Sequence, residues 1–272
     1  MKDKYQVIII GAGPAGIFTA IELMRGGAQS VLLADMGRHI DSRKCPARTT
    51  GVCARCKPCA IVSGWSGAGA FSDGKLSLSH DVGGHIVDYL GEEKADELIK
   101  YADGIYCEFG ANPEVHGLND KKVEEIKYEC SKYNIALVPC PVRHLGTERA
   151  FGVLRAMYKY LYAQPGFEFS ELTEAKEILV KDGRAAGVVF EKEGTRFKAE
   201  ADYVVAAPGR GGADWLNRAV RALGVPNENN EVDIGVRVEV PNSIMDHLTR
   251  HLYEAKLVYY SDTFENRVRT FC

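Results

Sequence analysis

Four cysteines in one short segment have the spacing of a metal-binding or redox site. Cys45, Cys53, Cys56 and Cys59 follow the pattern C-x7-C-x2-C-x2-C. Thiolates at such spacing bind iron–sulfur clusters or tetrahedral zinc. Arginine and lysine side chains lie close by in the sequence and favour the thiolate form, which also suits a redox-active thiol pair. Three interpretations stay open: a cluster or metal site, redox-active thiols, and a structural loop without chemistry.

A second candidate site lies near the start of the chain, where a branched apolar run meets a glycine-rich turn. Residues 7–10 read Val-Ile-Ile-Ile and lead into Gly-Ala-Gly-Pro-Ala-Gly. In a strand–turn–helix unit of this kind the first glycine allows the tight turn, the second lets a pyrophosphate approach, and the third lets the helix lie against the strand. The phosphates then sit at the helix N-terminus. The candidate cofactor contacts are Gly11, Gly13, Pro14, Ala15 and Gly16.

The elements around this turn support the same prediction. A helix is expected over about residues 15–25, with Gly26 as its C-terminal stop, and a second strand over residues 30–35. Asp35 ends that strand about 20 residues after the glycines, where an acid that binds an adenosine ribose is expected. The arrangement predicts a dinucleotide-binding unit.

Further elements are predicted along the rest of the chain. Apolar spacing predicts helices, and short branched runs between turns predict strands. The helices are expected over residues 92–106, 120–133 and 148–162, with a further one that opens within residues 210–216 and runs to about residue 223. The strands are expected over residues 135–138, 177–180, 186–190, 202–209 and 232–240. The last residues, 267–272, also look like part of a strand.

Two of these segments together resemble the FAD-binding domain of the glutathione reductase superfamily. The turn reads GxGPAG, and residues 175–209 resemble that superfamily's β-meander and the strand after it. The superfamily usually ends this strand with Ala-Thr-Gly, whereas this chain has Ala207-Pro208-Gly209. The resemblance implies FAD rather than NAD as the bound cofactor, with Ala207 and Gly209 passing close to it.

The cysteine run, the segment GWSGAGAFSDGKL at residues 64–76 and RHLGT at residues 143–147 resemble one group within that superfamily. This group is the FAD-dependent dehydrogenases of bacteria and archaea. The resemblance implies an α/β fold: a split Rossmann-like FAD-binding domain with a β-meander, a helical insertion and the start of a second α+β domain. The expected divisions are 1–86 and 141–215 for the FAD-binding domain, 87–140 for the insertion and 216–272 for the incomplete substrate or cap domain. The resemblance also implies a later return segment with an acidic residue and glycines, so we expect a C-terminally truncated chain.

The glycine-rich segment after the cysteines is expected to line the flavin. Closely spaced glycines let the backbone approach a ligand, and the apolar residues among them are unlike a solvated linker. The candidate FAD contacts here are Gly67, Ala68, Gly69, Asp73, Gly74 and Lys75. Lys75, Arg143 and His144 are the candidate catalytic residues, and Cys53, Cys56 and Cys59 are added if the thiols are redox-active.

Charge and cysteine content indicate which partners and which cellular compartment to expect. The formal net charge is −3, with 34 basic and 37 acidic residues, which gives no basis for binding nucleic acid or an anionic membrane. Eight cysteines without an export signal indicate a reducing compartment, so we expect a cytoplasmic flavoprotein. The expected function is oxidoreduction of a small-molecule substrate, or exchange with an electron donor or acceptor, through noncovalent FAD. NAD(P)H stays open as a transient donor, and the alternative is a non-catalytic or RNA-modification-type FAD-binding module.

Overall fold

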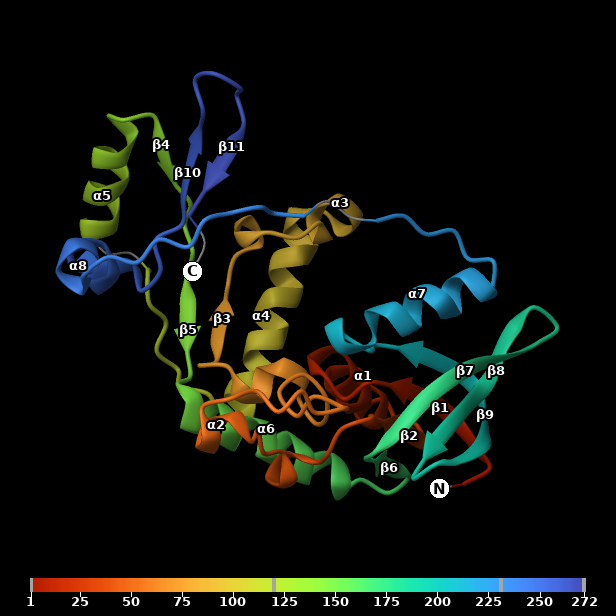
Figure 1. Ribbon diagram of the computed structural model, residues 1–272. Coiled ribbons are helices and arrows are strands. Elements are labelled where there is room, and N and C mark those ends of the chain that lie inside the picture. Colours follow the sequence, from red (N-terminus) through yellow and green to blue (C-terminus); the bar gives the residue numbers. More distant parts are fainter. Residues whose placement is uncertain (1, 119–120, 230–231, 271–272) are drawn as a thin grey trace. The chain divides into compact units, whose positions relative to one another are not determined.

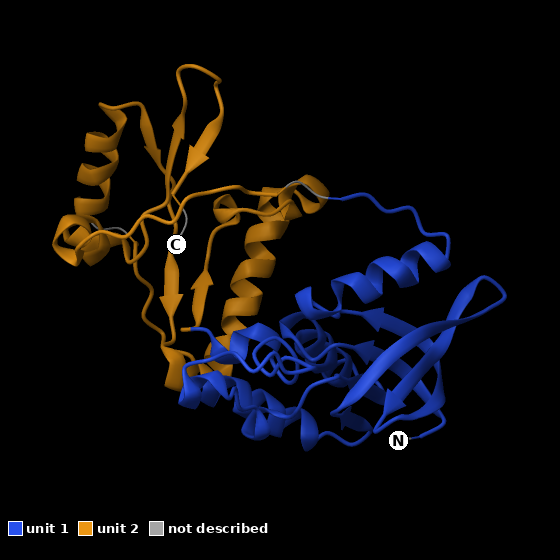
Figure 2. Cartoon of the chain, in the orientation of Figure 1, with its two compact units in different colours: residues 1–72, 151–231 blue, residues 73–150, 232–272 orange. Residues whose placement is uncertain are grey.

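The fold is a mixed α/β arrangement that divides into two units. It is described by a computed structural model that covers residues 2–118, 121–229 and 232–270. The first unit comprises residues 1–72 and 151–231, and the second comprises residues 73–150 and 232–272 (Figure 2). The first therefore brings together two segments that are far apart in the sequence.

A six-stranded sheet forms the centre of the first unit, in the order β6-β2-β1-β9-β8-β7 (Figure 1). The strands β6, β2, β1 and β9 are parallel, and β8 and β7 add to them in antiparallel fashion. The strand bounds are β1 Lys4–Ile10, β2 Val31–Ala34, β6 Phe167–Ser170, β7 Thr173–Lys181, β8 Arg184–Lys192 and β9 Thr195–Ala206.

The parallel strands are apolar because the sheet is covered on both faces around them. Residues 7–10 of β1 and all four residues of β2 are buried. A strand covered on both faces has a continuous apolar run rather than an alternating one. One core cluster extends from Ile8 and Leu32 on the parallel strands to Val188, Phe190 and Ala199 on the antiparallel ones.

The antiparallel strands form the predicted meander, and its turns have the residues that tight hairpins require. Asp182 and Gly183 join β7 to β8 with φ of 52° and 74°, and Glu193 and Gly194 join β8 to β9 with φ of 51° and 78°. Positive φ at both central residues matches the right-handed twist of the flanking strands. The long strand β9 pairs with β8 through residues 195–200 and with β1 through residues 200–206, so it connects the meander to the parallel part.

Helices and single turns complete the first unit. Their bounds are α1 Pro14–Arg25, η1 Ile40–Ser42, α2 Ala47–Thr50, η2 Gly67–Phe71, α6 Thr147–Tyr162, η4 Arg210–Gly212 and α7 Ala213–Ala222. The first four residues of α6 belong to the second unit. The helices α1, α6 and α7 agree with the predicted ones within two residues.

The second unit consists of helices and two small sheets. A three-stranded sheet has the order β11-β10-β4, and β3 pairs with β5 in a separate antiparallel ribbon. The bounds are β3 Lys75–Ser77, η3 His80–Val82, α3 Ile86–Leu90, α4 Glu92–Glu108, α5 Lys121–Ser131, β4 Ile135–Leu137, β5 Val142–His144, α8 Asn242–Leu252, β10 Leu257–Tyr260 and β11 Arg267–Arg269. Asp120, at the predicted start of α5, and residues 271–272 lie outside the described residues.

The strand predicted over residues 232–240 is wrong. This segment has no regular structure, and Val232, Ile234 and Val236 are 81%, 95% and 89% exposed. Alternation of apolar and polar residues is suited to a half-buried strand, but the strand exists only when a neighbour completes its hydrogen-bond ladder. No neighbouring strand pairs with this segment in the part of the chain that the structure describes.

Replacing Phe190 tests the core of the first unit. Its ring is fully buried and packs on Phe197 at a centroid distance of 5.8 Å. Phe190→Ala should lower the free energy of unfolding by about 3–5 kcal/mol, because the lost contacts leave a cavity. Tyr203→Ala on β9, where the side chain is 67% exposed, should change it by less than about 0.5 kcal/mol. Urea unfolding followed by fluorescence measures both, and equal midpoints would contradict this description of the core.

Candidate functional site

A cavity lies at the carboxyl ends of the central parallel strands. The strand β1 has β2 on one side and β9 on the other. The order of the parallel strands along the sheet therefore reverses at β1 relative to their order in the sequence. Open α/β sheets bind their ligands at such a point. The cavity is lined by Ile10, Gly11, Ala34, Asp35, Met36, Val62, Ser63, Thr173, Glu174, Ala175, Pro208, Gly211, Gly212 and Trp215.

The three glycines of the turn after β1 have different surroundings. A Cβ on Gly11 would lie 2.2 Å from the carbonyl oxygen of Ala207, and one on Gly16 would lie 1.9 Å from the carbonyl oxygen of Gly11. These two positions are therefore required for packing within the protein. A Cβ on Gly13, by contrast, meets nothing within 4 Å. Gly13 caps α1, so this open space lies at the helix N-terminus, where partial positive charge and free amides favour a phosphate.

Asp35 follows β2 and joins three loops through its carboxylate. Its Oδ2 accepts the amide of Ala12 at 2.8 Å, and its Oδ1 accepts the amides of Gly37 and Gly64, both at 2.7 Å. The side chain is 8% exposed and lines the cavity. A carboxylate has about four acceptor positions, so one remains on Oδ2 for a ligand hydroxyl.

Arg43 holds the loop that follows the cysteines, and sequence reasoning did not identify it. Its guanidinium donates five hydrogen bonds, all of them to backbone carbonyl oxygens. The acceptors belong to Ala60, Ile61, Trp65 and Gly67. Burial lowers the pKa of Arg43 to about 10, against the opposing charge of Asp35. A single arginine between Ser42 and Lys44 has no sequence signature, because only the folded loop presents these carbonyls together.

The loop held by Arg43 lies directly against the glycine turn. The amide of Ser66 donates to the carbonyl of Ala12 at 2.6 Å, and a Cβ on Gly67 would lie 3.4 Å from the Cα of Gly13. The predicted contacts Ala68 and Gly69 continue this loop as η2. Trp65 anchors the loop, because its side chain is buried and its indole N–H donates to the carbonyl of Leu154 at 3.0 Å.

The end of β9 lies on the other side of the same turn. The amide of Ala207 donates to the carbonyl of Ile10 at 2.8 Å. Gly209 has φ of 61°, and a Cβ there would meet nothing within 4 Å. Ala207 and Gly209 thus lie at the end of β9 beside the turn, and their contact with a cofactor stays a prediction.

The cysteine loop belongs to the first unit. Cys53, Cys56 and Cys59 are exposed and Cys45 is partly exposed, all as free thiols. Within the described residues no three His, Cys, Asp or Glu side chains are gathered around one point where a metal could bind. The predicted metal site is therefore not confirmed.

The remaining predicted contacts belong to the second unit. Gly74 has φ of 74° and packs on Leu145, whose amide donates to the Gly74 carbonyl at 2.9 Å. Lys75 forms an ion pair with Glu254, with 3.2 Å between Nζ and Oε2. Asp73 lies beside His144, at 3.9 Å from its Nε2.

Arg143 and His144 have different roles on β5. Arg143 is 6% exposed and binds Asp103 in a bidentate pair, with distances of 2.6 and 2.7 Å. Its Nη1 donates to the carbonyls of Asn112 and Glu114, so four of its five N–H donors have partners within the second unit. The catalytic role of Arg143 stays a prediction. His144 is partly exposed, and its ring lies 4.7 Å from that of Tyr253.

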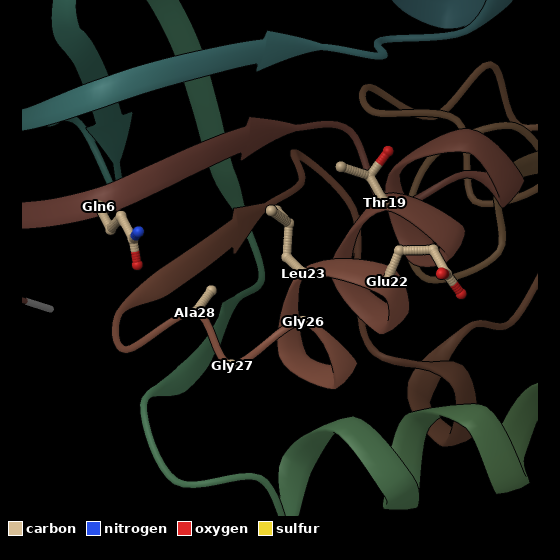
Figure 3. A pocket seen from close by; sticks show the side chains of 7 residues that line it. All are labelled: Gln6, Thr19, Glu22, Leu23, Gly26, Gly27 and Ala28. Carbon is tan, nitrogen blue, oxygen red and sulfur yellow. The ribbon is translucent and has the colours of Figure 1, made fainter.

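A second hollow lies at the opposite end of α1, and it is separate from the glycine turn. Figure 3 shows its lining residues around the C-terminal end of the helix and the start of β1: Gln6, Thr19, Glu22, Leu23, Gly26, Gly27 and Ala28. The helix dipole is negative at this end and the one charged lining side chain is a carboxylate, so the hollow is unsuited to a phosphate.

None of the described helices is long and apolar enough to cross a membrane.

Comparison with known proteins agrees with the geometry of the turn and the cavity. Two family models, both described as "FAD binding domain", match residues 4–50 and residues 87–231. The second match alone spans more than half of the chain. An uncharacterized protein of Clostridium beijerinckii is 28% identical over 279 residues, which cover 99% of this chain and 44% of that protein. The chain therefore spans less than half the length of this curated relative.

Two solved structures are similar to the chain at low identity. L-amino acid deaminase from Proteus myxofaciens is 17% identical, with a TM-score of 0.44, over 77% of this chain and 46% of the deaminase. 3-Ketosteroid-Δ4-(5α)-dehydrogenase from Rhodococcus jostii is 18% identical, with a TM-score of 0.46, over 75% of this chain and 45% of the dehydrogenase. Neither similarity transfers a substrate to this chain.

Gly13→Val tests whether the space beside Gly13 holds the cofactor pyrophosphate. The backbone there is extended, with φ of −72° and ψ of −179°, so valine fits without strain while its methyl groups fill the space. The variant should fold normally but purify with almost no FAD. Gly104→Val, at a helical glycine of α4 that also has open surroundings, should retain FAD. Stoichiometric FAD in the Gly13 variant, measured by absorbance and circular dichroism, would refute the placement.

Arg43→Lys tests the anchoring of the loop. Lysine keeps the charge but has three donors instead of five, so at least two charge-assisted hydrogen bonds are lost. We expect the free energy of unfolding to fall by about 3 kcal/mol or more. Arg155→Lys, in the half-exposed pair with Asp41, should cost less than about 1 kcal/mol. Equal losses in urea unfolding would show that the buried hydrogen bonds contribute little.

Proposed function

The chain belongs to the FAD-binding domain family, and on this premise we propose that it is the cofactor-binding part of an FAD-dependent oxidoreductase. The observation that carries the proposal is the open space at Gly13, which lies at the N-terminus of α1, directly after the strand β1 that has β2 on one side and β9 on the other. A loop glycine, Gly67, approaches the same position. A pyrophosphate would meet backbone amides there and no side chain.

The residues of the turn and the cavity suit the two ends of the adenosine diphosphate part of FAD. The N-terminal amides of α1 bind phosphate oxygens, while the free acceptor position of Asp35 binds one ribose hydroxyl. Bound FAD supplies hydride or single-electron transfer through its flavin ring. The protein contributes position and charge: hydrogen bonds to Asp35 and from Arg43 hold both loops in place, which lowers the entropic cost of ordering the backbone when the cofactor binds.

The arrangement of strands supports a glutathione reductase-type division of this domain. The strands β1 and β2 precede residues 73–150 of the second unit, and β6 and β9 follow them. The meander joins the parallel strands through β9. The rest of the second unit, residues 232–272, comes after all of these strands. We assign the second unit to substrate contact, with His144 and the Lys75–Glu254 pair as candidates. The substrate is a small molecule of unassigned class, and a reduced nicotinamide is a candidate donor.

The alternative function is an FAD-binding module without catalysis. The same turn would serve both functions, because it binds the nucleotide and not the reacting ring. The two differ in whether the bound flavin exchanges electrons with a small molecule. Full-length protein should be yellow and should release its FAD on acid denaturation, which shows noncovalent binding. Anaerobic mixing with NADH, NADPH and a panel of amino acids and hydroxy acids should bleach the flavin with one class of donor. Bound flavin that dithionite reduces but no donor does would favour the module.

Asp35→Asn tests the ribose contact and the structural role of the carboxylate together. The amide keeps the size of the side chain but removes the charge and turns one acceptor into a donor. We expect FAD binding to weaken at least tenfold, because a hydrogen bond to a charged group contributes about 1.5–3 kcal/mol. Asp41→Asn, in the half-exposed pair with Arg155, should leave the dissociation constant unchanged. Fluorescence titration of flavin-free protein measures both constants, and equal values would remove Asp35 from the site.

A further inference from the structure

The cysteine loop differs from the other cysteine positions in its exposure. Cys140 is buried and Cys107 and Cys130 are partly buried, as is usual for cysteines that only pack. Cys53, Cys56 and Cys59 are all exposed within seven residues. Three exposed free thiols on one loop have no packing role, and they would oxidise readily unless something bound them.

The loop also has an unusual charge. Between Asp41 and Asp73 the chain has no acidic residue, whereas Arg43, Lys44, Arg48, Arg55 and Lys57 contribute five positive charges. Four thiolates around one divalent zinc ion carry a net charge of −2, which a cationic loop stabilises.

The backbone already provides a donor to one of the sulfurs. The amide of Arg55 lies 3.4 Å from Cys53 Sγ, and Arg55 has φ of 50°, so the chain turns between Cys53 and Cys56. Amide hydrogen bonds to cysteine sulfur are among the contacts that tune thiolate metal sites.

From these observations we propose that Cys45, Cys53, Cys56 and Cys59 form a tetrathiolate metal site, occupied by zinc or by an iron–sulfur cluster. Three-residue steps separate Cys53, Cys56 and Cys59, and each step spans at most about 11 Å, so the chain permits the sulfurs to converge. Because no such group is gathered in the described residues, the metal closes the loop as it binds. Cys45 reaches the site across α2, which ends at Gly51 with φ of 72°.

The position of Cys59 connects this site to the nucleotide turn. Its carbonyl accepts the amides of Val62 and Ser63, which begin the loop that Asp35 and Arg43 hold against residues 11–16. Metal binding would therefore order one end of a segment whose other end borders the cofactor. The binding of metal does not depend on the proposed function. Only electron exchange between a cluster and the flavin would rest on it.

The test is metal content in protein purified without oxygen. Wild-type protein and Cys130→Ser, whose cysteine lies on α5, should retain either about one zinc per chain or iron with equimolar acid-labile sulfide. Cys56→Ser should lose the metal. Zinc without iron identifies a structural site, whereas visible absorption of iron and sulfide that dithionite bleaches identifies a cluster. FAD is measured in the same samples, so failure of flavin binding and failure of metal binding are seen separately.

A second measurement covers loss of metal during purification. Co²⁺ added to reduced, metal-free protein should produce the thiolate-to-cobalt absorption in wild type and in Cys130→Ser, but not in Cys53→Ser/Cys56→Ser. It should also slow alkylation of the exposed thiols by iodoacetamide at least tenfold. Absence of both metal and cobalt absorption in the wild type would overturn the proposal. Cobalt binding of the same affinity in the double variant would do so as well.

Discussion

The carboxylate of Asp35 is the constraint on which the nucleotide site depends. It accepts amides from the turn after β1, from the loop after β2 and from the loop before η2. All three segments are irregular, so their buried amides have no ladder or helix partner and must be satisfied in another way. A single buried anion satisfies three of them and fixes the segments relative to one another. Asp35 lines the cavity together with residues of these loops, among them Gly11 and Ser63.

Arg43 is the cationic counterpart of this arrangement. Where Asp35 accepts amides, the guanidinium of Arg43 donates to the carbonyls of the loop after the cysteines. The loop therefore keeps a definite path without strands or long helices of its own. Glycines make that path possible, since a Cβ on Gly37 would lie 2.3 Å from the amide nitrogen of Gly64. Backbone packs directly on backbone here, and no side chain intervenes.

The second unit shows how a charged residue can be structural. Arg143 looks like a substrate contact, because it is a cation at the end of a short strand before a helix. In the fold its guanidinium donates to both carboxylate oxygens of Asp103 and to two backbone carbonyls. Removing a guanidinium with so many partners leaves buried acceptors unsatisfied, which affects stability before it affects any reaction. Lys75 and His144, on the paired strands β3 and β5, keep more exposure.

Local patterns in the sequence determined the elements and the cofactor class. The branched run before Gly11, the glycine spacing and Asp35 at the end of β2 predict a dinucleotide turn because each requirement acts within a few residues of the chain. Hairpin residues such as Asp182 and Gly183 predict the meander for the same reason. Tertiary structure decided what depends on distant partners. Residues 232–240 alternate as a strand does but have no described neighbour, and Arg43 became an anchor only when four carbonyls came together around it. Strand pairing and buried hydrogen bonds join residues far apart in sequence, so spacing alone cannot reveal them.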